Sequence, residues 1–168
     1  MKRVLLACMA LVACGRTPDR PTATATPASG LEAAAIEAGV IADPAGTDIT
    51  GLYARDTDRV CIVPTATAYR IGVFVDYGED QTCGASGVVR HVGETLEVNF
   101  PQAPGCAFGA RFEGDRIVVP GQVPEACQQL CQGRASIAAL DLERLSVSAS
   151  EASTLRDAKG KLLCAGGD

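Results

Sequence analysis

The residues best suited to chemistry in this chain are its cysteines, of which there are eight. Cys127 and Cys131 are four residues apart, so on a helix their thiols would face one another and could hold a metal ion or form a redox pair. A Cys-x-x-Cys redox motif does not occur in the sequence. What the other cysteines do depends on the compartment that the chain enters, and the N-terminal residues address that question.

Residues 1–13 have the composition and order of a secretory signal peptide. Lys2 and Arg3 precede an apolar run from Val4 to Val12, and a small residue, Ala13, follows. A run of about nine apolar residues is too short to span a bilayer. We therefore interpret residues 1–13 as a signal peptide and expect the chain to be exported.

The stretch Leu11-Val12-Ala13-Cys14 resembles the lipobox of bacterial lipoproteins, in which the signal is cleaved before the cysteine and the thiol is lipidated. The resemblance covers only the first 14 residues. It implies lipidation of Cys14, with the acyl chains as a membrane anchor. Gly15 in place of Asp resembles the outer-membrane sorting signal of enteric bacteria, so the expected location is the periplasmic face of the outer membrane. The alternative is an ordinary secretory signal with a chance cysteine.

Six cysteines remain once Cys8 leaves with the signal and Cys14 carries the lipid. An even number in an exported domain of this size predicts three disulfides, although six cysteines allow many pairings. The predicted disulfide cysteines are Cys61, Cys83, Cys106, Cys127, Cys131 and Cys164.

A metal or redox site at Cys127-Gln-Gln-Leu-Cys131 is the competing interpretation. The spacing resembles the copper-binding motif of the Sco-type assembly proteins, which place Pro after the second cysteine and use a distant His on a thioredoxin-like fold. Here Gln132 follows, and the chain is rich in β-strand patterns. Structural disulfides are therefore the main interpretation, and we predict neither a metal site nor a cofactor.

Other side chains with catalytic potential have ordinary structural explanations. His91 is the only histidine, and within an apolar strand we expect it on the solvent side. Without a second histidine, a His-based zinc site or a hydrolase triad is poorly supported by the sequence, so we predict no catalytic residue. Gly84-Ala85-Ser86-Gly87 is interpreted as a glycine-rich turn rather than a nucleophile elbow.

Acidic residues gather at two predicted hairpin ends and are interpreted as turn residues rather than calcium ligands. One group is Asp76, Glu79 and Asp80, and the other is Asp56 with Asp58. The chain has no Trp and few aromatic residues, which argues against a sugar-binding groove.

The net charge argues against nucleic acid as a partner. Loss of Lys2 and Arg3 with the signal changes the formal net charge from -5 to -7. The remaining basic residues are scattered and form no basic face of the kind that nucleic-acid binding requires.

The elements predicted to position these residues are mostly β-strands. Residues 14–30 form a flexible tether after the lipidated Cys14, and residues 31–168 form one globular domain that begins with a helix over 31–41 and a turn at 43–46. Alternating apolar residues predict strands at 49–54, 59–64, 69–77, 86–92, 94–100, 106–112 and 115–120. Short Gly- and Asp-containing connections make the strands an antiparallel meander, which closes into a small barrel or forms a strongly twisted sheet.

The C-terminal third is predicted to contain short flanking helices and a closing strand. We expect a helix at 124–131, a strand within 135–145, and a helix from Ser148 to Lys159 with Gly160 as its stop. In such a meander the loops 78–85 and 101–105 lie at one end, so we expect Cys83 to pair with Cys106. One of Cys127 and Cys131 would then reach Cys61 and the other Cys164.

The expected fold is therefore mainly β, disulfide-stapled, with short flanking helices. The expected function is that of a non-enzymatic cell-envelope lipoprotein that binds a protein or a small ligand. A periplasmic lysozyme-inhibitor-like protein is the first alternative, because small β-barrel lipoproteins of that type are similar in size, export and cysteine use. A metal or redox protein using Cys127 and Cys131 is the second.

Overall fold

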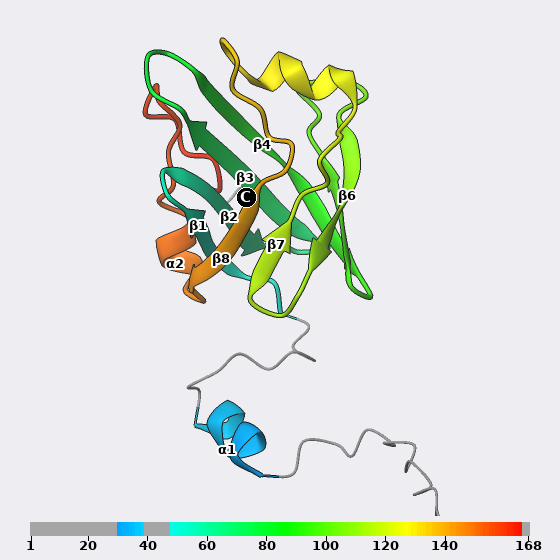
Figure 1. Ribbon diagram of the computed structural model, residues 1–168, viewed down its shortest axis with the longest axis vertical. Helices are drawn as coiled ribbons and strands as arrows, with labels where there is room; N and C mark the ends of the chain where they lie inside the picture. The colour runs from blue at the N-terminus through cyan, green and yellow to red at the C-terminus, as the bar shows by residue number, and fades with distance from the viewer. Residues whose placement is uncertain (1–29, 39–47, 166–168) are drawn as a thin grey trace, which may run out of the picture.

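The computed structural model describes residues 30–38 and 48–165 of the chain (Figure 1). The predicted signal peptide, Cys14 and tether residues 15–29 lie outside these ranges. So do Gly39 and the turn predicted at 43–46. Within the first range, the helix predicted at 31–41 is confirmed as α1, Leu31–Glu37.

Eight antiparallel strands form a closed barrel in which each strand pairs with its neighbours in the sequence and β1 pairs with β8. This confirms the predicted meander. The strands are β1 (Gly51–Arg55), β2 (Asp58–Pro64), β3 (Tyr69–Asp76), β4 (Thr82–Val92), β5 (Thr95–Asn99), β6 (Ala107–Phe112), β7 (Arg116–Val118) and β8 (Asp141–Ser146).

Alternation along the strands determines which side chains enter the barrel. In β5, Leu96 and Val98 are buried, whereas Glu97 and Asn99 between and beyond them are exposed. Tight turns make the meander possible, because Gly93 and Gly114 adopt positive φ values of 61° and 78°. The period-2 pattern thus produces one apolar interior and one mostly polar exterior.

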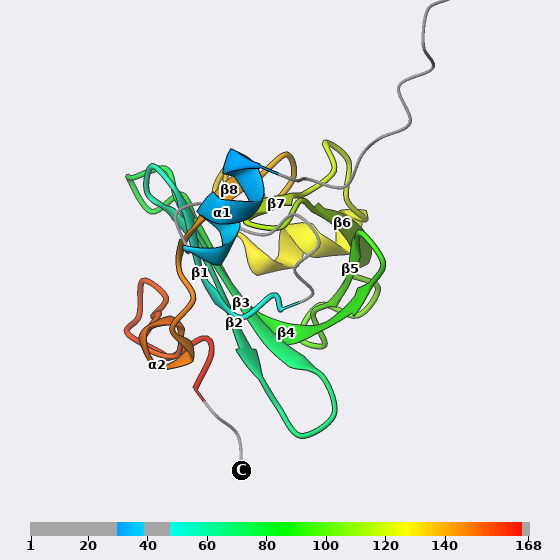
Figure 2. The ribbon, with the colours of Figure 1, turned by 90° about the horizontal axis from the view of Figure 1, so that it is seen from below.

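The two ends of the barrel differ in what closes them. Residues 48–51 lead into β1 at the end that we call proximal, together with the turns at 65–68, 93–94 and 113–115. The opposite, distal end carries the turns at 56–57 and 77–81, the loop 100–106 and residues 119–140, which we call the cap segment. Figure 2 looks along the barrel and shows η1 (Glu125–Leu130), part of the cap segment, lying across the distal opening.

The cap segment differs in detail from the prediction. The helix expected at 124–131 is a short 3-10 helix, η1, and the closing strand expected within 135–145 is confirmed as β8 at 141–146. Residues 135–140 are not strand, because they turn over the barrel end and bury Ile137 and Leu140 there. Ala139 makes this turn at φ 58° and donates its amide to Pro120 O at 3.0 Å.

Side chains fill the interior of the barrel. The remaining void has a volume of about 20 Å³ and a wholly apolar lining that includes Val60, Val73, Phe100 and Ile137. A volume of this size holds about one water molecule at most, and an apolar void stays dry. The interior therefore acts as a packed core.

β4 is longer than predicted, and the predicted turn at Gly84–Gly87 is wrong. β4 begins at Thr82, and residues 82–89 pair with β3 along its whole length. Glycine allows another part of the chain to approach the β4 backbone closely here, and the chain does not turn. A Cβ atom on Gly87 would lie 2.2 Å from Asn99 O and 2.8 Å from a ring carbon of Phe100. The pattern looked like a turn because glycine is common in both settings.

Residues 147–165, which we call the strap, leave β8 and cross the outside of the barrel. The predicted helix start at Ser148 is confirmed, since the Ser148 hydroxyl accepts a hydrogen bond from the Glu151 amide at 3.3 Å; the Ser148 amide donates to the Ser146 hydroxyl and not to Glu151. The prediction that this helix continues to Lys159 is wrong, because α2 spans only Ala149–Ala152. Beyond it the chain turns at Asp157, whose carboxylate accepts from the amides of Lys159 and Lys161, and this turn brings Leu163 back onto the barrel.

Candidate functional site

All six predicted cysteines of the domain form disulfides, as expected of a stapled fold, but the expected pairing is wrong. Cys61 pairs with Cys164, Cys83 with Cys131, and Cys106 with Cys127. Cys83 was placed in a loop near Cys106, whereas it lies inside β4 and points into the core. Cys61 points to the outside of β2, where only the strap can reach it.

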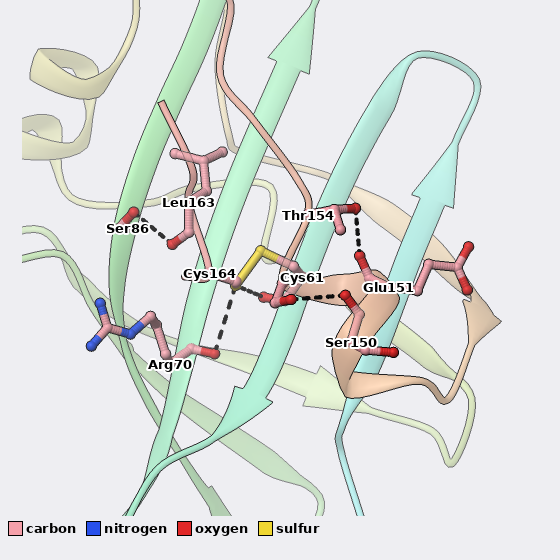
Figure 3. Close-up of a disulfide and its surroundings, with 9 residues drawn as sticks. Cys61, Arg70, Ser86, Ser150, Glu151, Thr154, Leu163 and Cys164 are labelled. Atoms are coloured by element: carbon pink, nitrogen blue, oxygen red, sulfur yellow. Dashed lines mark hydrogen bonds between the residues drawn. A yellow bond between two sulfur atoms is a disulfide. The ribbon is translucent and has the colours of Figure 1, made fainter. Parts of the chain in front are cut away.

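The strap is held on the barrel by a row of three outward-facing positions on adjacent strands (Figure 3). Cys61 of β2 bonds covalently to Cys164, and the Ser86 hydroxyl of β4 donates to Leu163 O at 2.7 Å. Gly72 of β3 lies between them, and a Cβ atom there would be 2.6 Å from that of Leu163. Glycine at this position therefore lets the strap lie directly on the sheet.

Contact with the strap creates a second apolar cluster outside the barrel. Its buried members are Cys61, Val63, Ala152, Leu163 and Cys164, and Leu52, Phe74 and Leu155 pack against them. The outer face of β2 and β3 is consequently covered, and it is not free to bind a partner.

Cys127 and Cys131 do not form a thiol pair in the structure. Each is bonded to a different strand region, Cys127 to Cys106 and Cys131 to Cys83. Within residues 30–38 and 48–165, no group of three or more His, Cys, Asp and Glu side chains is placed to hold a metal ion. The structure thus gives no support to a metal or redox site formed by Cys127 and Cys131 together, and a free-thiol titration of the native protein is its direct test.

Arg144 of β8 closes the proximal end. Its guanidinium lies over the rings of Tyr53 and Phe112, at 5.3 Å and 5.5 Å from their centroids. Nη2 donates to the carbonyl oxygens of Asp48 at 2.8 Å and Gly114 at 2.9 Å, while the buried Nε makes no hydrogen bond. Cation–π contacts and charged hydrogen bonds therefore tie three segments of the proximal rim together.

Burial raises the pKa of Tyr53 to about 12, against the lowering effect of the neighbouring Arg144 charge. The Tyr53 side chain is fully buried, and its hydroxyl donates to Ile49 O at 2.8 Å. Only the neutral phenol can donate this bond and avoid the cost of burying a charge.

We expect the Tyr53 ionisation to make the protein lose stability at alkaline pH. Below pH 10 both the folded and the unfolded chain keep the phenol proton; between pH 10 and about 12 only the unfolded chain loses it. The free energy of unfolding should fall over this interval by up to about 3 kcal/mol. Urea unfolding at a series of pH values measures the fall, and Tyr53→Phe should show a smaller one. Equal pH dependence in the two proteins would contradict the assignment.

His91 is not on the solvent side as predicted. Its ring packs edge-on against Phe112, with 5.2 Å between centroids, so it belongs to the proximal rim and is partly buried. The residue pairs with Leu96 of β5, whose side chain is fully buried, which places both on the inward face. Sequence reasoning missed this because Val88, Val89 and Val92 are all apolar, so the local pattern does not show which alternate set of β4 residues faces the core.

A hollow opens at the proximal rim, between the β2–β3 turn and the β4–β5 turn. We call it the rim groove; its volume is about 550 Å³. It is lined by Thr67, Ala68, Tyr69, Arg90, His91, Val92 and Gly93. Val92 is about half exposed, and Tyr69 also packs against the barrel core. The groove thus combines an aromatic ring, a cation and an apolar side chain on a rigid support.

The two acidic hairpin ends lie side by side at the distal end. Thr57 of the first hairpin donates its hydroxyl to Asp76 O of the second at 2.6 Å, and the Asp76 amide donates to the Asp58 carboxylate at 3.3 Å. Burial raises the pKa of Asp58, and this effect outweighs the hydrogen bond from Asp76. Glu79 and Asp80 at the second tip are exposed and adopt positive φ values of 50° and 62°.

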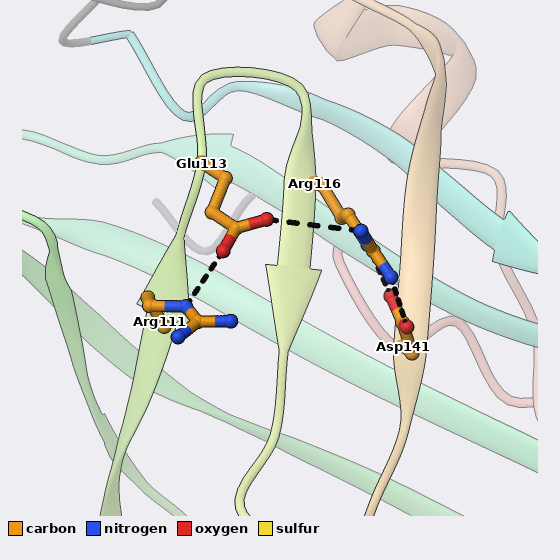
Figure 4. A network of polar contacts seen from close by, with 4 residues as sticks. All are labelled: Arg111, Glu113, Arg116 and Asp141. Carbon is orange, nitrogen blue, oxygen red and sulfur yellow. Dashed lines mark hydrogen bonds and ion pairs between the residues drawn. The ribbon is translucent and has the colours of Figure 1, made fainter.

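A row of alternating charges crosses the outside of β6, β7 and β8 (Figure 4). Glu113 bridges Arg111, at 2.7 Å, and Arg116, at 3.8 Å, and Arg116 binds Asp141 with two hydrogen bonds. These bonds lower the pKa of Asp141 and raise that of Arg116. Arg111 and Glu113 are exposed, Arg116 and Asp141 are partly exposed, and all four are paired, so the row is a largely solvated face worth little stability.

The rim groove and the Arg144 contacts were not predicted from the sequence. Arg144 is two residues after Leu142, so the period-2 rule alone places both on the inward face, and that signal was available. The groove depends on the register that sets Tyr69 opposite Val89, two residues before His91. No local pattern specifies that register.

Comparisons with protein-family models, with curated proteins and with solved structures find no match for this chain. In the described part of the chain, no helix is both long enough and apolar enough to cross a membrane. A functional assignment therefore depends on the geometry of the barrel surface.

Proposed function

We propose that this protein is a non-enzymatic cell-envelope lipoprotein, anchored through Cys14, whose barrel binds a partner protein at the rim groove. Three disulfides in one domain support an oxidising compartment, as export through the signal peptide requires. The lipobox supports an anchor at the N-terminus, with the periplasmic face of the outer membrane as the proposed location.

The observation that carries the proposal is the contrast between the interior and the rim. The interior void of about 20 Å³ cannot hold a small ligand, whereas the rim groove offers about 550 Å³. Binding by this barrel therefore belongs to its outer surface. Because the strap covers β2 and β3, the rim is one of the surfaces left for a partner.

The residue types in the rim groove favour a protein over a small molecule. Tyr and Arg are enriched among the residues that dominate protein–protein binding energy, and Tyr69 and Arg90 both line the groove. Small-molecule sites usually bury most of the ligand surface in a deeper cavity. A shallow groove with a half-exposed Val92 suits a segment of a protein surface better.

Capture of partners with wild-type and variant domains tests the proposal. Proteins from a periplasmic extract that bind residues 31–168 are identified, purified and titrated against each domain directly. Tyr69→Ala with Arg90→Ala should weaken the affinity for a true partner by about 100-fold, as expected for two central interface residues. The matched control is Tyr77→Ala with Arg134→Ala, which removes the same residue types from the distal end and should leave affinity unchanged.

Lysozyme inhibition is the second candidate, favoured by the adjacent acidic tips at the distal end. A cationic enzyme would be attracted to the exposed carboxylates of Asp56, Glu79 and Asp80, which Asp56→Asn, Glu79→Gln and Asp80→Asn remove. Purified lysozyme is added as a separate arm of the same titration. Binding that the acidic-tip variant abolishes and the groove variant keeps would favour the inhibitor and contradict the rim-groove proposal. If no protein distinguishes the groove variant from its control, the proposal is wrong.

A further inference from the structure

The three disulfides differ in how far solvent can reach them. Cys61, Cys83, Cys106, Cys127 and Cys164 are at most 1% exposed. Cys131 alone among the six is partly exposed, at the point where the cap segment leaves η1. Thiol exchange needs access to one sulfur of the bond, and Cys131 is the one disulfide residue among the six that keeps part of its surface in solvent.

A cavity of about 90 Å³ lies beside this disulfide, between the start of β4 and the turn of the strap. Cys83 and Thr82 line it on the barrel side, Leu130 and Gln132 on the cap-segment side, and Lys159 on the strap side. Cys83 and Cys131 face one another as an isolated antiparallel pair, and Gln132 donates its amide to Thr82 O at 2.7 Å. Buried Cys83 thus lines a cavity together with two residues of opposite charge, Lys159 and Asp157, while Cys131 is the partly exposed partner of the bond.

We propose that the Cys83–Cys131 disulfide is a thiol-exchange site that reacts with dithiols while the other two disulfides stay intact. A dithiol thiolate attacks the Cys131 sulfur and forms a mixed disulfide there, and Cys83 leaves as a thiolate into the cavity that Lys159 lines. The Lys159 charge favours the leaving thiolate, and the Asp157 carboxylate, which accepts from the amides of Lys159 and Lys161, opposes it.

The second thiolate of the reductant completes the reaction. This second thiolate attacks the reductant sulfur that is bonded to Cys131. The Cys131 thiolate is released, and the two reductant sulfurs form a disulfide. Two electrons pass from the dithiol to the protein, and the two protein thiolates take up protons from water. A partner of the dithiol oxidoreductase class would perform the same exchange.

Reduction at this site would affect the C-terminal part of the cap segment, residues 132–140. Cys106–Cys127 would still hold η1 to the loop before β6. Residues 132–140 would lose their covalent tie to β4, and these residues carry the Ile137 and Leu140 side chains that close the apolar interior. Amide hydrogen exchange in 132–140 should therefore rise on reduction, with the barrel strands unchanged.

Timed reduction of the mature protein with dithiothreitol tests the site. Samples are alkylated at intervals, and the labelled cysteines are mapped by mass spectrometry. Cys83 and Cys131 should be labelled together at least about 10-fold faster than the other four cysteines, while circular dichroism still reports the folded barrel. Faster opening of Cys61–Cys164 or Cys106–Cys127, or opening of all three with loss of the fold, would overturn the proposal.

A charge-neutral variant separates the role of Lys159 from simple accessibility. Lys159→Gln should slow the labelling of Cys83 and Cys131 by about threefold. Lys161→Gln is the matched control, since Lys161 is an exposed lysine on the same strap turn but does not line the cavity. Equal slowing by both variants would assign the effect to net charge and remove Lys159 from the mechanism. Neither result depends on the rim groove or its partner.

Discussion

Replacing both Cys61 and Cys164 with alanine is expected to lower the free energy of unfolding by more than 4 kcal/mol, roughly the whole contribution of a disulfide that closes so long a loop. The two cysteines are separated by 103 residues, the longest span of the three disulfides. Without the bond the strap is held mainly by Leu163, Ala152 and the Ser86 hydrogen bond. Its release would expose the apolar outer cluster to water.

Urea unfolding of the double variant measures the loss, and binding of a hydrophobic dye reports exposure of the outer cluster. The matched control is the Cys106→Ala, Cys127→Ala variant, whose disulfide closes a span of only 21 residues. Loop-closure entropy predicts a loss smaller by about 1.4 kcal/mol and little dye binding in the control. A larger loss in the control would show that chain entropy does not decide which disulfide contributes most to the free energy of unfolding.

Replacing Arg144 with methionine is expected to lower the free energy of unfolding by about 3 kcal/mol. Methionine keeps much of the packing but removes the charged hydrogen bonds to the Asp48 and Gly114 carbonyl groups, each worth about 1.5 kcal/mol or more. It also removes the cation–π contacts with Tyr53 and Phe112, which add about 0.5 kcal/mol or more each. Because the site is partly exposed to solvent, we expect a loss of about 3 kcal/mol and not the full sum of these contributions.

Two measurements check the Arg144 prediction. Urea unfolding gives the loss of stability, with Arg134→Met as control because Arg134 is exposed on the cap segment. Titration of tyrosinate absorbance gives the second readout, since the Arg144 charge lowers the pKa of Tyr53 and its removal should raise that pKa further. An unchanged Tyr53 titration would show that the guanidinium does not act on this ring.

The barrel was predictable because its strands carry the signal locally. Leu96, Val98 and the residues between them alternate in polarity, and tight turns such as Gly93 leave no room for crossover helices. Neighbours in sequence then become neighbours in the sheet. Closure between β1 and β8 was one of two expected outcomes, because its energy depends on all eight strands at once.

The disulfide pairing and the strap could not be predicted because they depend on which way a side chain points. Cys61 follows inward-facing Val60 by one residue, and that single step places it outside the barrel. Cys83 lies in a strand that looked like a turn, so its direction was misjudged. The helix predicted to Lys159 failed for a related reason, because packing of Leu163 on Gly72 outweighs local helix propensity.

If the protein is exported as proposed, the order of the disulfides along the chain has a consequence for its maturation. Each pair encloses the next: Cys61 with Cys164 spans Cys83 with Cys131, which spans Cys106 with Cys127. As the chain emerges from the translocation channel, Cys61 meets Cys83 first, and its true partner arrives last. Oxidation in order of emergence would join Cys61 to Cys83 and leave Cys131 for Cys164. Such a product reaches the native bonds only by disulfide rearrangement, so we expect the rate of maturation to depend on an isomerase in the receiving compartment.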